Sequence, residues 1–338
     1  MTLPKTCYYQ TLQVNPKACP EVIKAAYREL FKKYHPDRSP NTQTFAAKIG
    51  EAYNILSNED ARKKYDIERA QKRKAIGSYR LLEQIGEGGF GKTFKCEHVL
   101  TGELSCLKDC SNVPVEYREL LIEEARKMWN LRHFGIPAIR DIIKDEDGSI
   151  SLIMSFIPGH NLDQVIEITG KRIPFEHMVW ILTRVLNILM YLHDNGTIHG
   201  DIKPQNIIVL HKIHMASLVD FGLSTVRPTA DSRSIGYTDY YSPPEQINAS
   251  APPSPQGDFY SLGMTALFGL TGDIERVKSR QIPSDVPEEL RNFIRKLIVF
   301  RAEDRPSSAN QLFQELQDIR VKVFGRLHMG LELIPGLP

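Results

Sequence analysis

Apolar residues recur every three to four positions in the first part of the chain, a spacing that predicts helices. One helix is expected over residues 23–34, and Pro36 stops it because proline cannot continue a helix. A second apolar stripe predicts a helix over residues 45–56, and the polar run after it is typical of a cap for a last short helix. With a short helix over residues 7–12, this pattern indicates a compact all-α module over residues 5–70.

From residue 79 the apolar spacing changes to every second position, which predicts strands. Strands over residues 79–85 and 93–96 flank a glycine-rich turn, and a third apolar strand, 104–108, ends in a lysine. Glycine lets backbone N–H groups approach a phosphate without a side chain in the way. A Gly-x-Gly-x-x-Gly turn also occurs in dinucleotide-binding folds. There it opens a helix, so the strand–turn–strand context argues against such a fold.

The second half of the chain predicts long helices and buried strands. A helix is expected over residues 116–132, a buried strand over 150–156 and a mostly apolar helix over 175–195. A polar loop then leads into a β-branched run, 207–209, that is typical of a buried strand. The chain therefore combines a strand-rich stretch with helix-rich ones, which indicates the α+β class.

The polar loop places an acid, a cation and a carboxamide close together. Asp201 can accept the proton of an attacking hydroxyl, and Lys203 can neutralise a phosphoryl group during transfer. Asn206 offers a carbonyl oxygen to a hard cation such as Mg²⁺, and Asp220 supplies a second carboxylate. These residue types in this order indicate phosphoryl-transfer chemistry.

Composition and charge narrow the class of protein. A chain of 338 residues with 41% hydrophobic and 25% charged residues is typical of a soluble protein of about two domains. The net charge of +2 is unevenly spread, because residues 1–74 carry 15 Lys and Arg against 8 Asp and Glu. Such a basic module suits an acidic partner, and nucleic acid is the generic alternative.

The five cysteines form no Cys-x-x-Cys pair and no zinc-ligand spacing, which makes a reduced, cytoplasmic location the default. Cys106, two residues before Lys108, is either a small packing residue or a reactive thiol. The polar N-terminus lacks the apolar stretch of a signal peptide, and no apolar run reaches the roughly 18 residues of a membrane span. We therefore expect no membrane partner.

The loop over residues 199–206 and the later Asp220-Phe221-Gly222 resemble the catalytic loop and metal-binding motif of protein kinases, H-R-D-x-K-P-x-N and D-F-G. Gly200 stands where most kinases have arginine, and in this the loop resembles bacterial eukaryotic-like kinases. The resemblance covers about residues 79–320. It implies a two-lobed kinase fold with a β-rich N-lobe, an α-rich C-lobe and an apolar C-terminal tail, over residues 79–156, 157–322 and 323–338. The tail is expected to pack on the C-lobe, with partner binding as the alternative.

By this resemblance the protein transfers the γ-phosphoryl group of ATP to protein hydroxyls, with Mg²⁺ or Mn²⁺. The residues that hold ATP are Gly86, Gly88, Gly91, Lys108, Glu124 as the ion-pair partner of Lys108, Met154 and Ile157. Glu123 is the alternative to Glu124. The catalytic residues are Asp201 and Lys203, the metal ligands are Asn206 and Asp220, and the substrate-loop residues are Thr238, Glu245 and Arg305, the last two as a buried pair.

The N-terminal module resembles the J domain of DnaJ-type co-chaperones. The resemblance rests on Tyr8-Tyr9, the helix 23–34, His35-Pro36-Asp37 and the A-Y-N-I-L-S run at residues 52–57. It implies docking on a DnaK-type heat-shock chaperone and stimulation of its ATPase. The implied contact residues are His35, Pro36, Asp37, Arg28 and Lys32. Glu29 departs from the usually basic helix face, and an inert helical module for dimerisation or positioning is the alternative.

Two departures from the kinase pattern carry expectations about regulation. Gly200 removes the arginine that a phosphate on the activation segment neutralises, so activity is expected without that phosphorylation. Candidate autophosphorylation sites remain at Ser224, Thr225, Thr229, Ser232 and Ser234. The chain between Asp258 and Arg305 is short, so substrate recognition is expected to fall to the J domain, joined by the short connector 71–78.

The sequence therefore predicts a cytoplasmic serine/threonine protein kinase fused to a J domain that recruits or stimulates a DnaK-type chaperone. One alternative is a co-chaperone whose kinase fold senses nucleotide or docks clients without phosphotransfer. Another is a nucleic-acid-binding kinase that uses the basic front end, but no basic groove with interleaved aromatic residues supports it.

Overall fold

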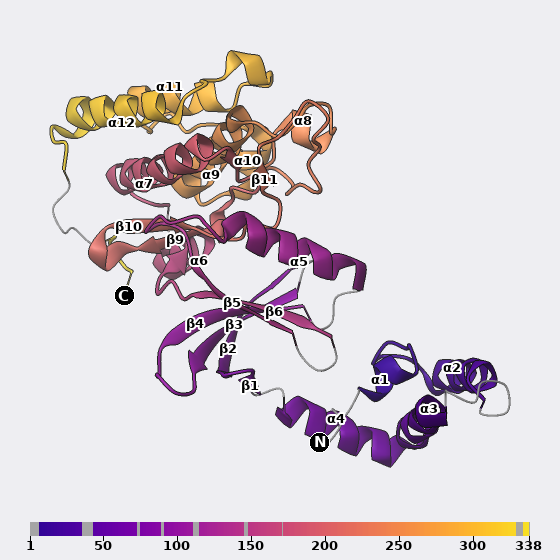
Figure 1. Cartoon of the computed structure of the whole chain (residues 1–338). Helices are drawn as coiled ribbons and strands as arrows, with labels where there is room; N and C mark the ends of the chain where they lie inside the picture. The colour runs from indigo at the N-terminus through magenta and orange to yellow at the C-terminus, as the bar shows by residue number, and fades with distance from the viewer. Residues whose placement is uncertain are drawn as a thin grey trace. The chain divides into compact units, whose positions relative to one another are not determined.

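The computed structural model describes residues 7–35, 43–72, 75–88, 91–110, 115–144, 148–170, 172–328 and 334–337. The chain forms two compact units, Met1–Arg118 with Asp141–Ile153, and Glu119–Arg140 with Met154–Pro338 (Figure 1). The first unit holds an N-terminal group of helices and a β-sheet, and the second is mostly helical. The α+β class expected from the sequence is confirmed.

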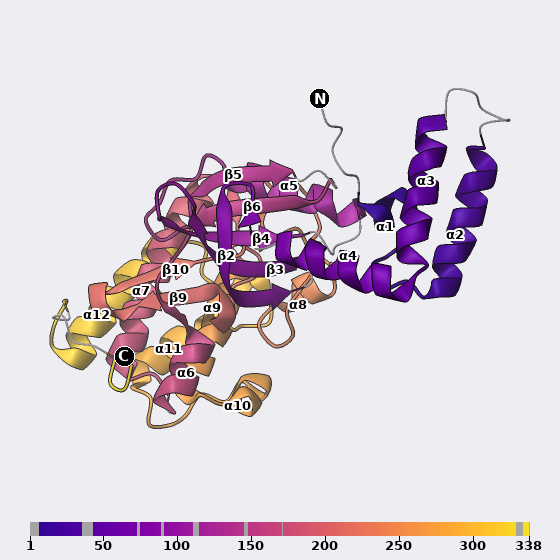
Figure 2. The same cartoon turned by 90° about the horizontal axis from the view of Figure 1, so that it is seen from below.

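The described N-terminal helices are α1 (Tyr8–Thr11), α2 (Pro20–Lys33), α3 (Gln43–Leu56) and α4 (Glu59–Lys72). α2 and α3 lie side by side in both views (Figure 1 and Figure 2). The apolar stripes predicted from the sequence meet in one core, whose buried members include Tyr9, Ile23 and Ile49. The predicted cap is also present, because the Asn58 side chain accepts a hydrogen bond from the Ala61 N–H at 2.9 Å.

A polar network joins α4 to the start of the chain. The Tyr9 hydroxyl donates to the Asp66 carboxylate at 2.9 Å and accepts from Arg62 Nε at 2.9 Å. Arg62 also donates to the backbone carbonyls of Pro16 and Ala18. One buried ring thus links α1, the loop after it and α4, and Arg62 serves the fold rather than the basic surface.

A six-stranded sheet forms the rest of the first unit, in the order β1-β2-β3-β4-β6-β5. Its strands are β1 (Ala75–Ile76), β2 (Tyr79–Gly88), β3 (Gly91–His98), β4 (Leu104–Asp109), β5 (Ile139–Lys144) and β6 (Ile150–Ser155). β1 to β4 are antiparallel neighbours, as the alternating pattern predicts. One face buries a cluster of apolar side chains that includes Tyr79, Leu107 and Ile153.

The β2–β3 hairpin carries the glycine-rich turn, and Gly88 pairs with Gly91 at its end. Gly91 has a φ of 124°, and a Cβ at that position would lie 2.3 Å from the Asp109 carbonyl oxygen. No other residue fits this close approach without a shift of the backbone. The glycine is therefore required by the sheet itself, apart from any role toward phosphate.

The second unit is built around α7 (Phe175–Asp194), which is buried on most of its surface. The helices that accompany it are the later part of α5 (Val115–Met128), then α6 (Leu162–Thr169), α8 (Pro244–Ile247), α9 (Pro255–Thr271), α10 (Ile274–Ser279), α11 (Glu288–Leu297) and α12 (Ala309–Phe324). α7 and α12 lie side by side in Figure 1 and share one apolar core with α9 and α11. This core fixes the positions of the loops that lie between the helices.

Two small sheets frame the catalytic loop. β7 (His160–Asn161), β9 (Ile207–Leu210) and β10 (Met215–Leu218) form an antiparallel three-stranded sheet. β8 (Thr197–Ile198) pairs with β11 (Thr225–Val226). β8 and β9 enclose residues 199–206, so the loop is held at both ends by strands.

Some sequence expectations need correction. α5 ends at Met128 rather than at residue 132, because Trp129 N–H turns back to the Arg126 carbonyl at 3.3 Å. By length and composition α7 does pass as a membrane span, contrary to the expectation that no run is long enough. Its most apolar window is 67% buried inside the protein, as in the core helix of a globular domain.

The apolar tail behaves as expected where the structure describes it. Ile334 and Leu337 are buried in the same core as α7 and α12. Leu331 and Leu333 lie outside the described residues. α10 has only six residues, which agrees with the trimmed region expected after Gly272.

Replacement of Tyr9 by Phe tests the network around α4. We expect a loss of about 1 kcal/mol of local stability, because the side chains of Arg62 and Asp66 each lose a buried hydrogen-bond partner. Hydrogen exchange of the α4 amides should then accelerate several-fold. Tyr8→Phe is the control, since the Tyr8 hydroxyl bonds Glu51 at the surface. Equal effects of the two variants would contradict this account.

Candidate active site

The carboxylate of Asp258 anchors the catalytic loop. Asp258, in the first turn of α9 and 1% exposed, accepts the backbone N–H groups of His199 at 3.0 Å and Gly200 at 2.8 Å. His193 Nε2, on α7, lies 2.9 Å from the same carboxylate. Three donors thus satisfy a buried charge that would otherwise be costly.

Gly200 adopts a conformation that favours glycine. Its φ is 75°, and an added Cβ would lie 2.9 Å from the Leu223 carbonyl oxygen. The Gly200 carbonyl accepts from the Gln246 side chain at 2.9 Å, and Gln246 also donates to the Gly236 carbonyl at 2.9 Å. Backbone contacts therefore hold this position, where the kinase motif H-R-D has arginine.

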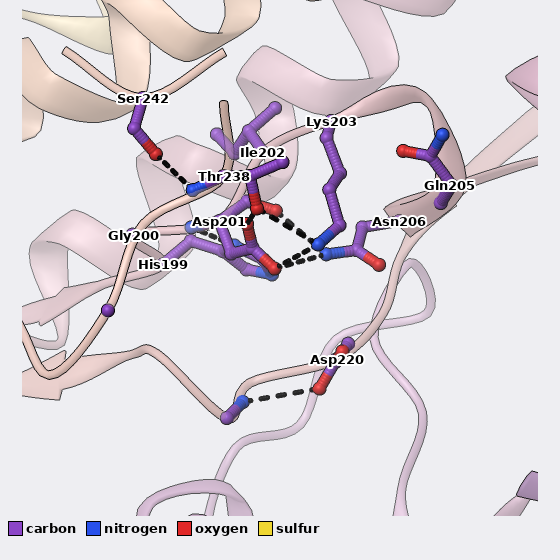
Figure 3. A network of polar contacts seen from close by, with 12 residues as sticks. His199, Gly200, Asp201, Ile202, Lys203, Gln205, Asn206, Asp220, Thr238 and Ser242 are labelled. Atoms are coloured by element: carbon purple, nitrogen blue, oxygen red, sulfur yellow. Dashed lines mark hydrogen bonds and ion pairs between the residues drawn. The ribbon is translucent and has the colours of Figure 1, made fainter. Parts of the chain in front are cut away.

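The predicted catalytic residues meet in one polar network (Figure 3). Asp201 Oδ1 accepts from the Thr238 hydroxyl at 2.6 Å, and Oδ2 lies 2.8 Å from Lys203 Nζ. Lys203 Nζ also donates to the Thr238 hydroxyl at 3.1 Å. Asp201 is buried and Lys203 is partly exposed. A carboxylate, a partly exposed ammonium and a hydroxyl thus contact one another at this site.

Asn206 belongs to this network, and together with Asp220 it forms a candidate cation site. Asn206 Nδ2 donates to the Asp201 carbonyl at 2.8 Å and to Asp201 Oδ2 at 3.0 Å, which leaves its Oδ1 as the atom offered to a cation. Asp220 has a φ of 64°, uncommon for a residue with a side chain, and lies below Asn206 in Figure 3. One carboxylate and one amide oxygen suit Mg²⁺, which completes its shell with phosphate and water oxygens.

No group of three or more His, Cys, Asp or Glu side chains with metal-binding geometry occurs among the described residues.

His199 joins the catalytic loop to the segment that begins at Asp220. Its Nδ1 accepts from the Asp201 N–H at 3.2 Å, and its ring meets the Phe221 ring edge-on at 4.8 Å. Complete burial lowers the pKa of His199, although three nearby aspartates act in the opposite direction. The ring is therefore neutral near pH 7 and acts as a spacer that fixes Asp201.

The substrate loop is fixed by an ion pair and by local hydrogen bonds. Arg305 Nη1 and Nη2 donate to the two oxygens of Glu245 at 2.6 and 2.9 Å, and the Arg305 side chain is 0% exposed. Arg305 also donates to the carbonyls of Val299 and Phe300. Thr238 N–H donates to the Ser242 hydroxyl at 2.9 Å. The pair that the sequence suggested is thus present and holds the loop that carries Thr238.

The predicted nucleotide-binding residues are divided between the two compact units. Gly86, Gly88 and Gly91 lie on the β2–β3 hairpin, and Lys108 is buried on β4 opposite Thr93. In the other unit Glu124 is 3% exposed on α5, Met154 is buried and Ile157 half-buried.

The structure distinguishes between the alternatives that the sequence left open at Glu123 and at Cys106. Glu123 is exposed and forms an ion pair with Arg126, so the buried Glu124 is the better candidate partner for a lysine. Burial raises the pKa of the Cys106 thiol to about 12, which keeps it protonated. Cys106 is therefore a packing residue rather than a reactive thiol.

Among the N-terminal candidates, Arg28 and Lys32 are exposed one turn apart on α2, and Glu29 is exposed beside them. The His35 ring meets the Phe31 ring edge-on at 5.4 Å. Pro36 and Asp37 lie outside the described residues.

Sequence patterns alone did not assign the roles of Asp258, Gln246 and Lys127. A charged residue at the head of the apolar α9 is a signal that could have indicated a buried anchor at Asp258. Gln246 and Lys127 gave no such signal, because each contacts the backbone of a segment far away in the sequence. Of the five candidate phosphorylation sites, Ser224 is buried and donates to the Phe221 carbonyl at 2.7 Å.

Comparison with known proteins places these features in a family. Residues 79–316 match the protein kinase domain, and residues 7–66 match the DnaJ domain. Serine/threonine-protein kinase B of Synechocystis is 29% identical over 270 residues, which cover 71% of this chain and 46% of that protein. A probable serine/threonine-protein kinase of Dictyostelium discoideum is 30% identical over 257 residues, 71% of this chain and 51% of that protein.

Human receptor-interacting serine/threonine-protein kinase 1 is 30% identical over 199 residues, which cover 54% of this chain and 29% of that protein. The chain thus spans about half or less of the length of these relatives. The kinase match covers more than half of the chain and includes the whole polar network around Asp201. The chain therefore belongs to the protein kinase family and carries an N-terminal DnaJ domain.

Proposed function

We propose that this protein is an ATP-dependent serine/threonine kinase that phosphorylates protein hydroxyls. The observation that carries the proposal is the contact of Asp201 with both Thr238 and Lys203. Asp201 Oδ1 already accepts one hydroxyl hydrogen at 2.6 Å, so it has the position and polarity to accept that of a substrate. The relatives named above are serine/threonine kinases, which supports this acceptor class.

In the proposed step the substrate oxygen attacks the γ-phosphorus and the bond from that phosphorus to the β,γ-bridging oxygen breaks. Asp201 orients the hydroxyl and receives its proton, and ADP leaves with the electron pair of the broken bond. Lys203 offsets negative charge that develops on the phosphoryl oxygens. Asn206 and Asp220 would hold Mg²⁺, or Mn²⁺, which supplies charge neutralisation on the phosphates when bound.

The nucleotide-binding assignment follows the same family pattern. We assign ATP to the backbone of Gly86, Gly88 and Gly91 and to Lys108, with Glu124 as the partner of that lysine. The burial of Lys108 and of Glu124 supports this assignment. Met154 and Ile157 would then border the adenine.

We further propose that the J domain recruits or stimulates a DnaK-type chaperone through His35, Pro36, Asp37, Arg28 and Lys32. The DnaJ match and the exposed cations on α2 support this. The alternative remains a co-chaperone whose kinase fold binds nucleotide without transfer. Cys7, Cys19, Cys96, Cys106 and Cys110 all lie within the described residues and form no disulfide. This supports the cytoplasmic location that we propose.

The loop around Gly200 favours activity without phosphorylation of the activation segment. A cavity beneath the segment is lined by Gly200, Ser234, Glu245 and Asp258, among others, and none of its described lining residues is basic. A phosphate on Ser234 would meet carboxylates there and gain no cationic partner from this lining.

Asp201→Asn should lower kcat for transfer of labelled phosphate from ATP to a protein substrate by about 10²–10⁴-fold, because the variant cannot accept the proton. ATP binding, measured by calorimetry, should be retained. Asp194→Asn, an exposed change at the end of α7, is the matched control. Full activity in Asp201→Asn would refute the assignment. ATP binding without transfer in the wild type would favour the co-chaperone alternative.

Alanine at Thr225, Thr229, Ser232 and Ser234 together should leave the rate of substrate phosphorylation within about twofold of the wild type, and Ser234→Glu should not raise it. For all four sites the reason is Gly200, which stands where the kinase motif has the arginine that such a phosphate neutralises. For Ser234 a second reason is that none of the described residues lining its cavity is basic. Steady-state kinetics with mass measurement of the purified proteins provide the check. A strong loss in the alanine variant, restored by Ser234→Glu, would show dependence on phosphorylation.

His35→Gln should abolish stimulation of the chaperone ATPase and leave phosphotransfer to a generic substrate unchanged, because the contact lies in the J domain. Lys64→Ala, an exposed change on α4, is the control and should retain stimulation. Stimulation that survives His35→Gln would show that His35 is not the contact residue. A wild type that does not stimulate the chaperone ATPase would favour an inert positioning module.

A further inference from the structure

Lys127 makes an unusual contact from α5 to the activation segment. Its Nζ donates to the Ser224 backbone carbonyl at 2.5 Å, across a separation of 97 residues in the sequence. Both residues belong to the same compact unit. Ser224 is the fourth residue after Asp220, so the contact lies two residues beyond the end of Asp220-Phe221-Gly222. A helix-borne cation thus reaches the segment that carries the candidate metal ligand.

The environment of Lys127 indicates that its contact with Ser224 is partly buried, unlike an ion pair at the surface. The side chain is partly buried, and burial lowers the pKa of Lys127, an effect that Glu124 and Glu123 partly offset. Glu124 lies one turn earlier on α5 and is itself buried, and Met128 beside Lys127 belongs to the apolar core. An ammonium group in such a place is costly unless hydrogen bonds compensate, and the Ser224 carbonyl supplies one.

The segment held by Lys127 is already closed by a tight turn. Ser224 N–H and its hydroxyl both donate to the Phe221 carbonyl, at 3.0 and 2.7 Å. Next along the chain, β11 pairs with β8, and Arg227 N–H donates to the Gly196 carbonyl at 2.6 Å. Leu223 lies against Gly200 in the catalytic loop. Local contacts thus shape the turn, and Lys127 joins it to α5.

We propose that Lys127 is a positioning residue that holds the turn after Asp220, and so sets the place of the Asp220 carboxylate for metal and phosphate. The proposal rests on the kinase function proposed above. The permanent hydrogen bond from Lys127 to a main-chain carbonyl would fix the activation segment, as a contact between arginine and a phosphorylated residue would in a kinase that has that arginine. The lysine contact needs no phosphorylation. Because Glu124 and Lys127 share one face of α5, any displacement of this helix changes both groups together.

The test compares Lys127→Met, which keeps the apolar stem but removes the donor, with Lys127→Arg, which restores one. Arg126→Met on the same turn is the matched control, since Arg126 is exposed and pairs with Glu123. The readouts are kcat, KM for ATP, the Mg²⁺ concentration for half-maximal rate, and hydrogen exchange over residues 221–227. Lys127→Gln, whose amide is too short to reach Ser224 in the same way, replaces the Met variant if that does not fold.

We expect Lys127→Met to lower kcat on the order of 10- to 100-fold, with a higher Mg²⁺ requirement and little change in KM for ATP. Exchange at the Ser224 and Arg227 amides should accelerate, and Lys127→Arg should restore both properties. If Lys127→Met matches Arg126→Met in rate and exchange, the proposal is wrong. It is also wrong if exchange accelerates throughout the unit, since that is general destabilisation.

These readouts separate the two proposals. A wild-type protein that transfers no phosphate would defeat the proposed kinase function. Exchange over residues 221–227 in Lys127→Met would still test whether the lysine holds the segment. Normal transfer with unaltered exchange in Lys127→Met would defeat only the role of Lys127.

Discussion

The buried carboxylate of Asp258 is the interaction on which the catalytic region depends. It accepts two consecutive backbone N–H groups, from His199 and Gly200, and lies beside His193 on α7. The two backbone amides need an acceptor, and the carboxylate, which is only 1% exposed, needs donors. The carboxylate and the two amides thus satisfy each other's hydrogen-bonding groups. The backbone of the next residue, Asp201, is held in place as a result.

From that anchor the site is assembled by contacts between different parts of the chain. Thr238 reaches Asp201 and Lys203 because the loop that carries it is held by Glu245 and Arg305. Asp258 and Arg305 are charged, buried and hydrogen-bonded to several partners, an arrangement that is costly to break but rigid once formed. Side chains that act on substrate are thereby held by groups that do not touch it.

Much of this could be predicted from the sequence, and the reasons differ from element to element. The helices around Ile23 and Ile49 and the hairpin before Gly91 follow from local apolar spacing and from the steric freedom of glycine. Asp201, Lys203 and Asn206 lie within six residues, so a short motif includes them all. The contacts of Asp258 and Lys127 were not predicted, because only tertiary packing brings their partners to them.

Gly200 also has a consequence for how this kinase can change over evolutionary time. A single substitution to arginine would place a Cβ 2.9 Å from the Leu223 carbonyl in a left-handed backbone conformation. A phosphate-responsive cation could therefore return only with an accompanying shift of the Leu223 backbone. In kinases that have this glycine, a new means of regulating activity can therefore evolve more easily on other surfaces. The fused helical domain is one such surface, since it can change in sequence without disturbing the catalytic loop.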